Sequence, residues 1–227
     1  MIAFILIKFV LYPVLGFALG TDLPLVAVMS GSMTHDLADG TVCGVTPQNY
    51  DASFDAYWRT CGNWYASRNI TREAFQAFPF VNGFDKGDIM LLLGVDRGST
   101  DVGDIIVFQA RGQYPIIHRV IWKGTDESGK ASFATKGDHN PAQISQYIVV
   151  NNQGAASRCA SPQGEPLPCG YGAPVTRETP GALALIDETH VTHDTIIGRA
   201  VFRVPWLGWI RVGVGNLINL ASGQSLN

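Results

Sequence analysis

The chain has 227 residues, a formal net charge of −3 and no run of basic residues, which argues against nucleic acid as a partner. Only 15% of its residues are charged, while Gly and Pro number 25 and 12, a composition typical of short strands and many turns rather than of a helical bundle. We therefore expect a mostly β fold. The chain beyond residue 20 is long enough for one large domain with its own core.

Residues 2–20 form an almost unbroken apolar stretch in which Lys8 is the one charged residue. A helix over these residues would rise roughly 28 Å, close to the roughly 30 Å hydrocarbon thickness of a bilayer. The rival interpretation is a secretory signal peptide, because Ala18-Leu-Gly20 is an acceptable small-x-small cleavage site. We interpret residues 1–20 as a transmembrane anchor. Ser32, which is the candidate nucleophile described below, follows them closely and would be held beside the membrane by an anchor, whereas cleavage would release it.

Apolar, β-branched runs follow the anchor, several of them next to Gly-Asp turns, in which Gly supplies backbone freedom and Asp caps the turn. In residues 114–122 the alternation of side chains places His118 on one face with Ile116 and Val120, so a histidine lies within an apolar strand face. The predicted strands are residues 23–29, 89–93, 105–108, 114–122, 131–135 and 195–204.

Three segments depart from this strand pattern. Residues 34–83 are rich in aromatic and polar side chains and include a predicted helix over 71–78 with Thr71 as N-cap, so we expect a small α/β or irregular subdomain inserted into a β-rich catalytic domain of residues 21–204. Residues 149–184 contain closely spaced Gly and Pro turns and are expected to form a long loop. The apolar tail 205–227 carries Arg211 and is short for a span, which favours a membrane-interfacial or docked segment.

The four cysteines fall into two local pairs, and neither has the CxxC spacing of a zinc or thioredoxin-like site. We prefer two disulfides, Cys43–Cys61 and Cys159–Cys169, in a domain outside the cytosol; cross-pairing and free thiols remain open alternatives. Asn69-Ile-Thr71 is a glycosylation sequon, which agrees with that location. No metal site and no cofactor are predicted.

Ser32, in the run Val28-Met-Ser-Gly-Ser-Met33, is the candidate nucleophile, and a serine hydroxyl needs a neighbouring base. His118 is the first choice for that base because its strand can face a cleft, whereas His35 lies only three residues from Ser32 and is the alternative. Asp138 is the best-placed group to orient the imidazole, although an Asp in an ordinary Gly-Asp turn explains it equally well.

Six short boxes follow one another along the chain. They are Ser30-Gly-Ser-Met33, Lys86-Gly-Asp88, Gly103-Asp-Ile-Ile-Val-Phe108, Ile117-His-Arg-Val120, Thr135-Lys-Gly-Asp138 with Asn140, and Ile197-Gly-Arg-Ala200 with Pro205 and Gly208. Taken together and in this order, they resemble the boxes of type I signal peptidases. The histidine of Ile117-His-Arg-Val120 stands where bacterial members carry a lysine, so the resemblance is to the archaeal and endoplasmic-reticulum branch.

The resemblance implies a membrane-bound serine endopeptidase that removes signal peptides from exported preproteins and cuts after small residues at −1 and −3. It implies Ser32 as nucleophile, His118 as general base, and the Ser32 amide with the Ser30 hydroxyl as donors to the oxyanion. Its expected partners are secretory preproteins, membrane lipid, and translocation machinery or accessory subunits. It also implies a single-pass protein of the cell membrane, or of the endoplasmic-reticulum membrane in a eukaryote, with the catalytic domain on the extracytoplasmic side.

The sequence departs from this family in two places. Members of this branch carry a further aspartate shortly after the Lys-Gly-Asp box, often assigned as the catalytic acid, where this chain has Ile144. Asp138 is our choice for the acid, with Asp187, Glu188 or no acid as alternatives. The family also reaches its next box by a short turn after the serine-methionine pair, whereas here the long segment 34–83 intervenes.

Three other functions remain open. A serine-lysine protease would use Lys136 or Lys86 as its base, and a relative without catalytic activity would explain the missing aspartate. A secreted, disulfide-stapled binding module would also fit the cysteines and the β-rich composition.

Overall fold

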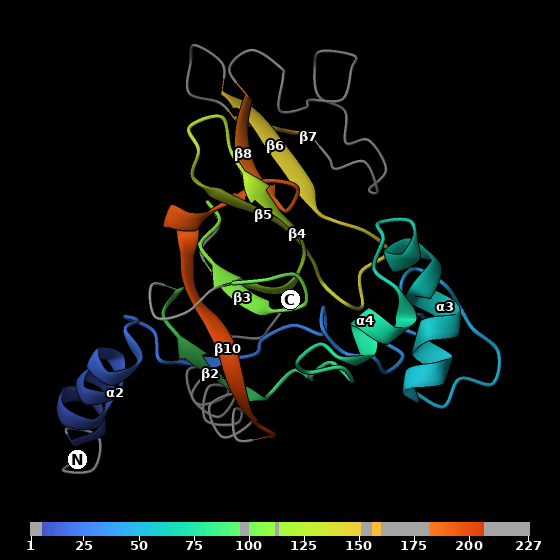
Figure 1. The fold of residues 1–227 in the computed structure, drawn as a ribbon, viewed down its shortest axis with the longest axis horizontal. Helices are drawn as coiled ribbons and strands as arrows, with labels where there is room; N and C mark the ends of the chain where they lie inside the picture. Colours follow the sequence, from blue (N-terminus) through green and yellow to red (C-terminus); the bar gives the residue numbers. More distant parts are fainter. Residues whose placement is uncertain (1–5, 96–99, 112–113, 151–155, 160–181, 207–227) are drawn as a thin grey trace, which may run out of the picture.

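The computed structural model of the chain describes residues 6–95, 100–111, 114–150, 156–159 and 182–206 (Figure 1). At the N-terminal end a π-helical turn, η1 (Ile7–Leu11), runs into helix α2 (Tyr12–Leu19), which ends at Gly20 in the left-handed conformation. No helix within these ranges has the length and apolar character needed to cross a bilayer. The transmembrane anchor predicted over residues 1–20 is therefore not confirmed.

Helix α2 is attached to the domain that follows it. The Gly94 amide donates to the Leu19 carbonyl at 2.8 Å, and the Thr21 hydroxyl donates to the Ile197 carbonyl at 2.8 Å. A Cβ atom at Gly94 would lie 1.9 Å from the Gly20 carbonyl oxygen, so this close approach requires glycine. The end of α2 thus has a fixed position against the sheet.

The main body is a curled antiparallel sheet of seven strands in the order β1-β2-β10-β3-β4-β5-β9 (Figure 1). A smaller sheet in the order β7-β6-β8 lies beyond β5. The strands of the first sheet are β1 (Leu25–Ala27), β2 (Ile89–Leu93), β3 (Ile105–Phe108), β4 (Ile116–Thr125), β5 (Ala131–Lys136), β9 (Val191–Thr192) and β10 (Ile196–Val204), with a 3-10 turn, η3 (His193–Thr195), between the last two. Those of the second are β6 (Ser145–Val150), β7 (Ala156–Cys159) and β8 (Ala182–Asp187).

The prediction of a mostly β protein is confirmed, and the strands expected at 89–93 and 105–108 have those bounds in β2 and β3. Each strand is preceded by a Gly-Asp turn, which gives a sharp start that a sequence pattern can locate. The segment expected as a long loop, 149–184, instead contains the end of β6, all of β7 and the start of β8. Residues 151–155 and 160–181, and with them Cys169, lie outside the described residues, as do residues 207–227 of the tail.

Residues 34–83 contain two helices, α3 (Phe54–Ala66) and α4 (Arg72–Gln76), which lie beside each other to one side of the sheet (Figure 1). Thr71 is the N-cap of α4, as predicted, and its hydroxyl accepts from the Ala74 amide at 3.2 Å. The disulfide Cys43–Cys61 joins the start of the segment to α3.

The aromatic side chains of these helices build a core that continues into the sheet. Tyr57, Tyr65 and Phe75 are fully buried and pack in one cluster with Ile121 of β4 and Ala134 of β5. Residues 34–83, which we call the insert, are therefore packed on the sheet through a shared core.

Candidate active site

The loop that carries Ser32 is fixed at both ends. Before it, the Val28 amide donates to the Asp88 carbonyl at 2.8 Å. After it, Met33 is fully buried in a core cluster with residues of β2, β3 and β10, and the Phe84 amide donates to the Met33 carbonyl at 3.1 Å. Ser32 itself is partly exposed in the turn between these two hydrogen bonds, so its hydroxyl is held in place and is accessible.

Strand β4 brings His118 to this hydroxyl. Its Nε2 atom lies 2.9 Å from Ser32 Oγ, and the imidazole is 3% exposed. The other ring nitrogen, Nδ1, makes a short hydrogen bond with Oε1 of Glu188. A carboxylate can only accept, so the network assigns the proton of the neutral imidazole to Nδ1 and leaves Nε2 free to accept from Ser32. The Ser30 hydroxyl lies 3.1 Å from Ser32 Oγ.

Glu188 follows the last residue of β8 and is fully buried. Its Oε1 also accepts from the Thr135 hydroxyl at 3.1 Å, and its Oε2 accepts from the Ile144 amide at 2.6 Å. The main chain of Glu188 is held too, since its carbonyl accepts from the Thr135 amide at 2.8 Å. Ile144 is the position at which the resembled family carries aspartate. In this structure the Glu188 carboxylate, from a distant part of the chain, lies next to that position.

Asp138, the first choice of acid from the sequence, does not contact His118. Its Oδ1 accepts from Arg119 Nε at 2.9 Å and from the Tyr65 hydroxyl at 3.1 Å, and its Oδ2 accepts from Arg119 Nη2 at 2.6 Å. His35 Nε2 lies 3.1 Å from Oδ2, and the Tyr57 hydroxyl donates to the Asp138 carbonyl at 2.9 Å. Both carboxylate oxygens are thereby occupied. Asp138 binds Arg119, whose side chain lies on the face of β4 opposite to that of His118.

Asp138 and Arg119 are both fully buried and form an ion pair. Burial by itself disfavours the charged carboxylate, but the Arg119 guanidinium and the His35 hydrogen bond outweigh it and hold the pKa of Asp138 well below its usual range. Burial raises the pKa of the Tyr57 and Tyr65 hydroxyls well above the ordinary value, with a further contribution from the Asp138 charge. These phenols are therefore hydrogen-bond donors at neutral pH.

The other residues considered as base or acid are placed elsewhere. His35 is buried, stacks on the Tyr57 ring at 3.5 Å between centroids, and faces Asp138 rather than the serine. Asp187 accepts from the Tyr147 hydroxyl at 2.5 Å and from the Thr189 amide at 3.0 Å. The Asp187 carboxylate thus binds Tyr147 of β6 and the turn after β8 rather than His118.

The two lysines considered as bases also lie apart from the Ser32 hydroxyl. Lys136 Nζ donates to the carbonyls of Gly137 at 2.9 Å and Asp138 at 3.2 Å, and Lys86 is exposed. Burial lowers the pKa of Lys136 to about 7 although the Asp138 and Glu188 charges act against it. Lys136 therefore binds main-chain atoms of the residues that follow it.

Gly137 lies directly against Ser32 and His118. A Cβ atom at this position would be 2.7 Å from His118 Nε2, from the Ser32 carbonyl oxygen and from Asn140 Nδ2. Real Cβ atoms do not approach so closely, so the glycine of the Lys-Gly-Asp box allows the segment to pass under the imidazole.

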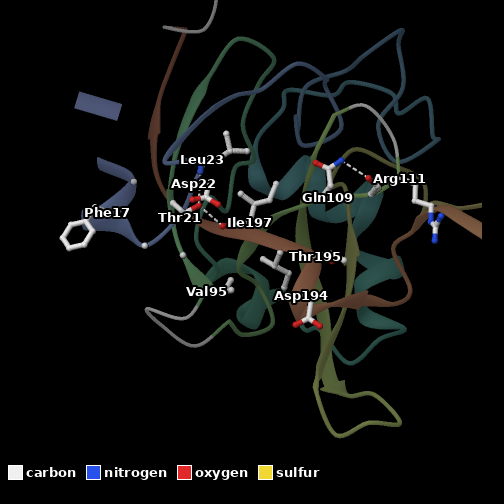
Figure 2. Close-up of a pocket in the computed structure, with 15 residues that line it drawn as sticks. Phe17, Thr21, Asp22, Leu23, Val95, Gln109, Arg111, Asp194, Thr195 and Ile197 are labelled. Carbon is white, nitrogen blue, oxygen red and sulfur yellow. Dashed lines mark hydrogen bonds between the residues drawn. The ribbon is translucent and has the colours of Figure 1, made fainter. Parts of the chain in front are cut away.

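A pocket of about 1020 Å³ lies between α2, the segments that follow β2 and β3, and the start of β10 (Figure 2). Phe17, Thr21, Thr195 and Ile197 are among the residues that line it. Ser32, His118 and Glu188 are absent from its lining, so this pocket is not the candidate catalytic centre.

The chain matches no protein-family model. It is 40% identical over 60 residues to the signal peptidase complex catalytic subunit SEC11 of Eremothecium gossypii, a match that covers 26% of this chain and 35% of the relative. The SEC11 subunit of Komagataella phaffii is 36% identical over 75 residues, which cover 30% of this chain and 43% of the relative. Human SEC11C is 38% identical over 58 residues, 25% of this chain and 30% of the relative.

The matched stretches thus span less than half of the relatives' length. The relatives bear the name of the family that the sequence boxes resemble. The resemblance is therefore confirmed: the chain is similar to SEC11 catalytic subunits of the signal peptidase complex.

Proposed function

We propose that this protein is a serine endopeptidase that removes N-terminal signal peptides from exported preproteins. The observation that carries the proposal is the continuous hydrogen-bonded chain from Ser32 through His118 to Glu188. A hydroxyl, an imidazole and a buried carboxylate in this order form the arrangement that activates serine in acyl transfer, and it is recognised by geometry rather than by the order of residues in the chain.

In the proposed mechanism, Ser32 Oγ attacks the carbonyl carbon of the −1 residue while its proton passes to His118 Nε2. Glu188 holds the tautomer of His118 and stabilises the imidazolium that forms. The oxyanion receives hydrogen bonds from the Ser32 amide and from the Ser30 hydroxyl. His118 then gives its proton to the leaving amine, the C–N bond breaks, and water hydrolyses the acyl-serine with His118 as base.

This assignment replaces Asp138 by Glu188 as the catalytic acid. It keeps Ser32, His118 and Ser30 in the roles expected from the sequence. The Thr135 hydroxyl and the Ile144 amide hold the two oxygens of Glu188, so the carboxylate has one orientation available when His118 becomes charged.

The substrate side of the proposal depends on β1, the strand at one end of the seven-stranded order, which leads directly into the Ser32 loop. An edge strand offers main-chain groups to an extended peptide, and small pockets beside it would select small residues at −1 and −3. We further propose that residues 1–20 anchor the protein in the membrane, with the catalytic domain on the extracytoplasmic side. Accessory subunits of a signal peptidase complex are its proposed partners.

The test is cleavage of a secretory preprotein by the full chain in liposomes, with the product mass identifying the bond cut. Wild type should cut after a small −1 residue, and Ser32→Ala and His118→Ala should leave no cleavage above background, while Lys86→Ala, at an exposed position apart from the site, should cut like wild type. Cleavage by Ser32→Ala at the rate of wild type would disprove the assignment. Wild-type protein that binds preprotein without cutting it, with and without extracted accessory subunits, would show a relative that lacks catalytic activity.

A further inference from the structure

The insert is connected to the candidate active site through one buried residue, Asp138. Of the side chains that bind Asp138, His35, Tyr57 and Tyr65 all belong to the insert, and Arg119 comes from β4. His35 and the two tyrosines are buried, and the two tyrosine hydroxyls also lie 3.1 Å from each other. Asp138 thus joins the insert to the strand that carries His118.

The residues on either side of Asp138 touch the catalytic pair. The His139 amide donates to the Ser32 carbonyl at 2.9 Å, and Gly137 lies under His118 Nε2. On its other side the insert holds the same segment, because the Cys43 amide donates to the His139 carbonyl at 2.9 Å. Residues 137–139 are therefore held between the insert and the Ser32 loop.

Arg119 is the next residue after His118 and has a fixed position of its own. Its Nη1 donates to the carbonyls of Pro79 and Gly103 at 2.8 and 2.9 Å, and its Nη2 donates to the Phe80 carbonyl at 2.9 Å. Pro79 and Phe80 belong to the last turn of the insert. A buried charge with all its donors engaged has few alternative positions, since any displacement leaves donors unsatisfied.

We infer that His35, Tyr57 and Tyr65 are positioning residues, through which the insert holds the 137–139 segment and thereby fixes the distance between Ser32 and His118. The inference rests on the proposed function, because the geometry it concerns is that of the proposed nucleophile and base. It gives the insert a role in catalysis although none of its side chains meets the reacting atoms.

Tyr65→Phe is the most direct test, because it removes one hydrogen bond to the carboxylate and keeps the ring in the core. Thr60→Val is the matched control: it removes a hydroxyl from the same helix that donates to the Ala56 carbonyl and does not touch Asp138. Asp138→Asn is less informative, since it leaves the buried Arg119 guanidinium without a carboxylate and folding itself is then expected to suffer.

We expect Tyr65→Phe to lower kcat for preprotein cleavage by about tenfold, with KM unchanged and with Tm matched to that of Thr60→Val, which should cut like wild type. A second readout needs no activity. The His139 amide, which donates to Ser32, should exchange with solvent faster in Tyr65→Phe than in Thr60→Val when followed by NMR on the full chain in detergent.

Equal kcat in the two variants, or a loss in Tyr65→Phe that appears only in KM, would overturn the inference. So would unchanged His139 exchange in Tyr65→Phe. If wild type does not cut preprotein while His139 exchange still responds to Tyr65→Phe, the coupling between insert and Ser32 loop stands and the proposed function fails.

Discussion

Glu188 accepts a hydrogen bond from His118 across 70 positions of the sequence, and the bond links the two sheets of the protein. His118 lies within β4 of the seven-stranded sheet, and Glu188 follows β8 of the three-stranded one. The meeting is fixed by main-chain bonds, because the Thr135 amide at the end of β5 donates to the Glu188 carbonyl at 2.8 Å. The position of β8 relative to β5 therefore controls the environment of the imidazole.

If Glu188 is the acid, Glu188→Gln should lower kcat by about 10³- to 10⁴-fold with little change in KM, as removal of the carboxylate of a serine triad does elsewhere. Asp187→Asn is the neighbouring control, since its carboxylate binds Tyr147 and Thr189 and not His118. Steady-state cleavage of a preprotein in liposomes measures both. A larger loss in Asp187→Asn than in Glu188→Gln would refute the assignment.

Gly137→Ala should abolish cleavage, because the added methyl group would lie 2.7 Å from His118 Nε2 and from the Ser32 carbonyl. Gly129→Ala is the comparison: unlike Gly137 this residue has a positive φ angle, of 81°, but a Cβ there meets nothing within 4 Å. Both variants are to be assayed for kcat and for Tm. Wild-type kcat in Gly137→Ala would mean that the segment under His118 can move aside.

Lys136 should make stability rise with pH above neutrality. Its pKa is about 7 in the folded protein, whereas a lysine in an unfolded chain has a pKa of about 10.4. Between these values the unfolded state binds a proton that the folded state does not, so the free energy of unfolding increases as pH rises from about 7 towards about 10. Above that range the buried tyrosines act in the opposite direction, since their raised pKa values favour the unfolded chain.

Urea unfolding at a series of pH values from 7 to 9.5 measures this slope. Lys136→Met, which keeps an apolar side chain of similar length, should flatten it. A variant whose slope equals that of wild type would show that Lys136 is charged to the same extent in both states.

The disulfide Cys43–Cys61 should stabilise the insert. It closes a loop with a sequence separation of 18, for which the chain-entropy model predicts about 3 kcal/mol. Reductant should lower the Tm of wild type and have no effect on this transition in a Cys43→Ser/Cys61→Ser double variant, as followed by differential scanning calorimetry. An identical Tm for wild type with and without reductant would argue that the insert is held by its aromatic core alone.

Asn69 offers a test of the proposed orientation in the membrane. It is exposed, with a φ angle of 61°, in the turn between α3 and α4, and it begins the sequon Asn69-Ile-Thr71. Translation into endoplasmic-reticulum microsomes should yield a glycosylated product that Asn69→Gln does not give, if the catalytic domain faces the lumen. An unmodified product that external protease digests completely would place the domain on the cytoplasmic side.

The sequence predicted the sheet better than it predicted the site. Strands such as β2 and β3 carry their own signal, because an apolar run that follows a Gly-Asp turn has a defined start. The cap of α4 at Thr71 was likewise a local signal. Helix α3 was missed although its buried residues recur at helical spacing, because that stripe consists of Tyr57, Cys61 and Tyr65 rather than of aliphatic residues.

Ser32 and His118 were identifiable because each has a local context, a serine turn and a strand face. The proposed acid was not, since the expected choice, Asp138, depended on its place in the Lys-Gly-Asp box. Glu188 was named among the alternatives, but nothing in its own neighbourhood distinguishes it from Asp187. Its contact with His118 depends on how two sheets meet, and no pattern within one strand contains that information.

The adjacency of His118 and Arg119 makes the candidate active site sensitive to the register of a single strand. Consecutive residues of β4 serve two separate networks, one facing Ser32 and one facing Asp138, and β3 fixes which is which by pairing Ile106 with His118 and Ile105 with Arg119. A one-residue deletion in the turn between β3 and β4 that slipped this pairing would move Arg119 into the place of His118 and Val120 into the place of Arg119, so that a guanidinium would face the serine and Asp138 would lose its ion pair. Natural variation in the length of that turn should therefore be compensated by a bulge before β4, so that the pairing itself is inherited unchanged.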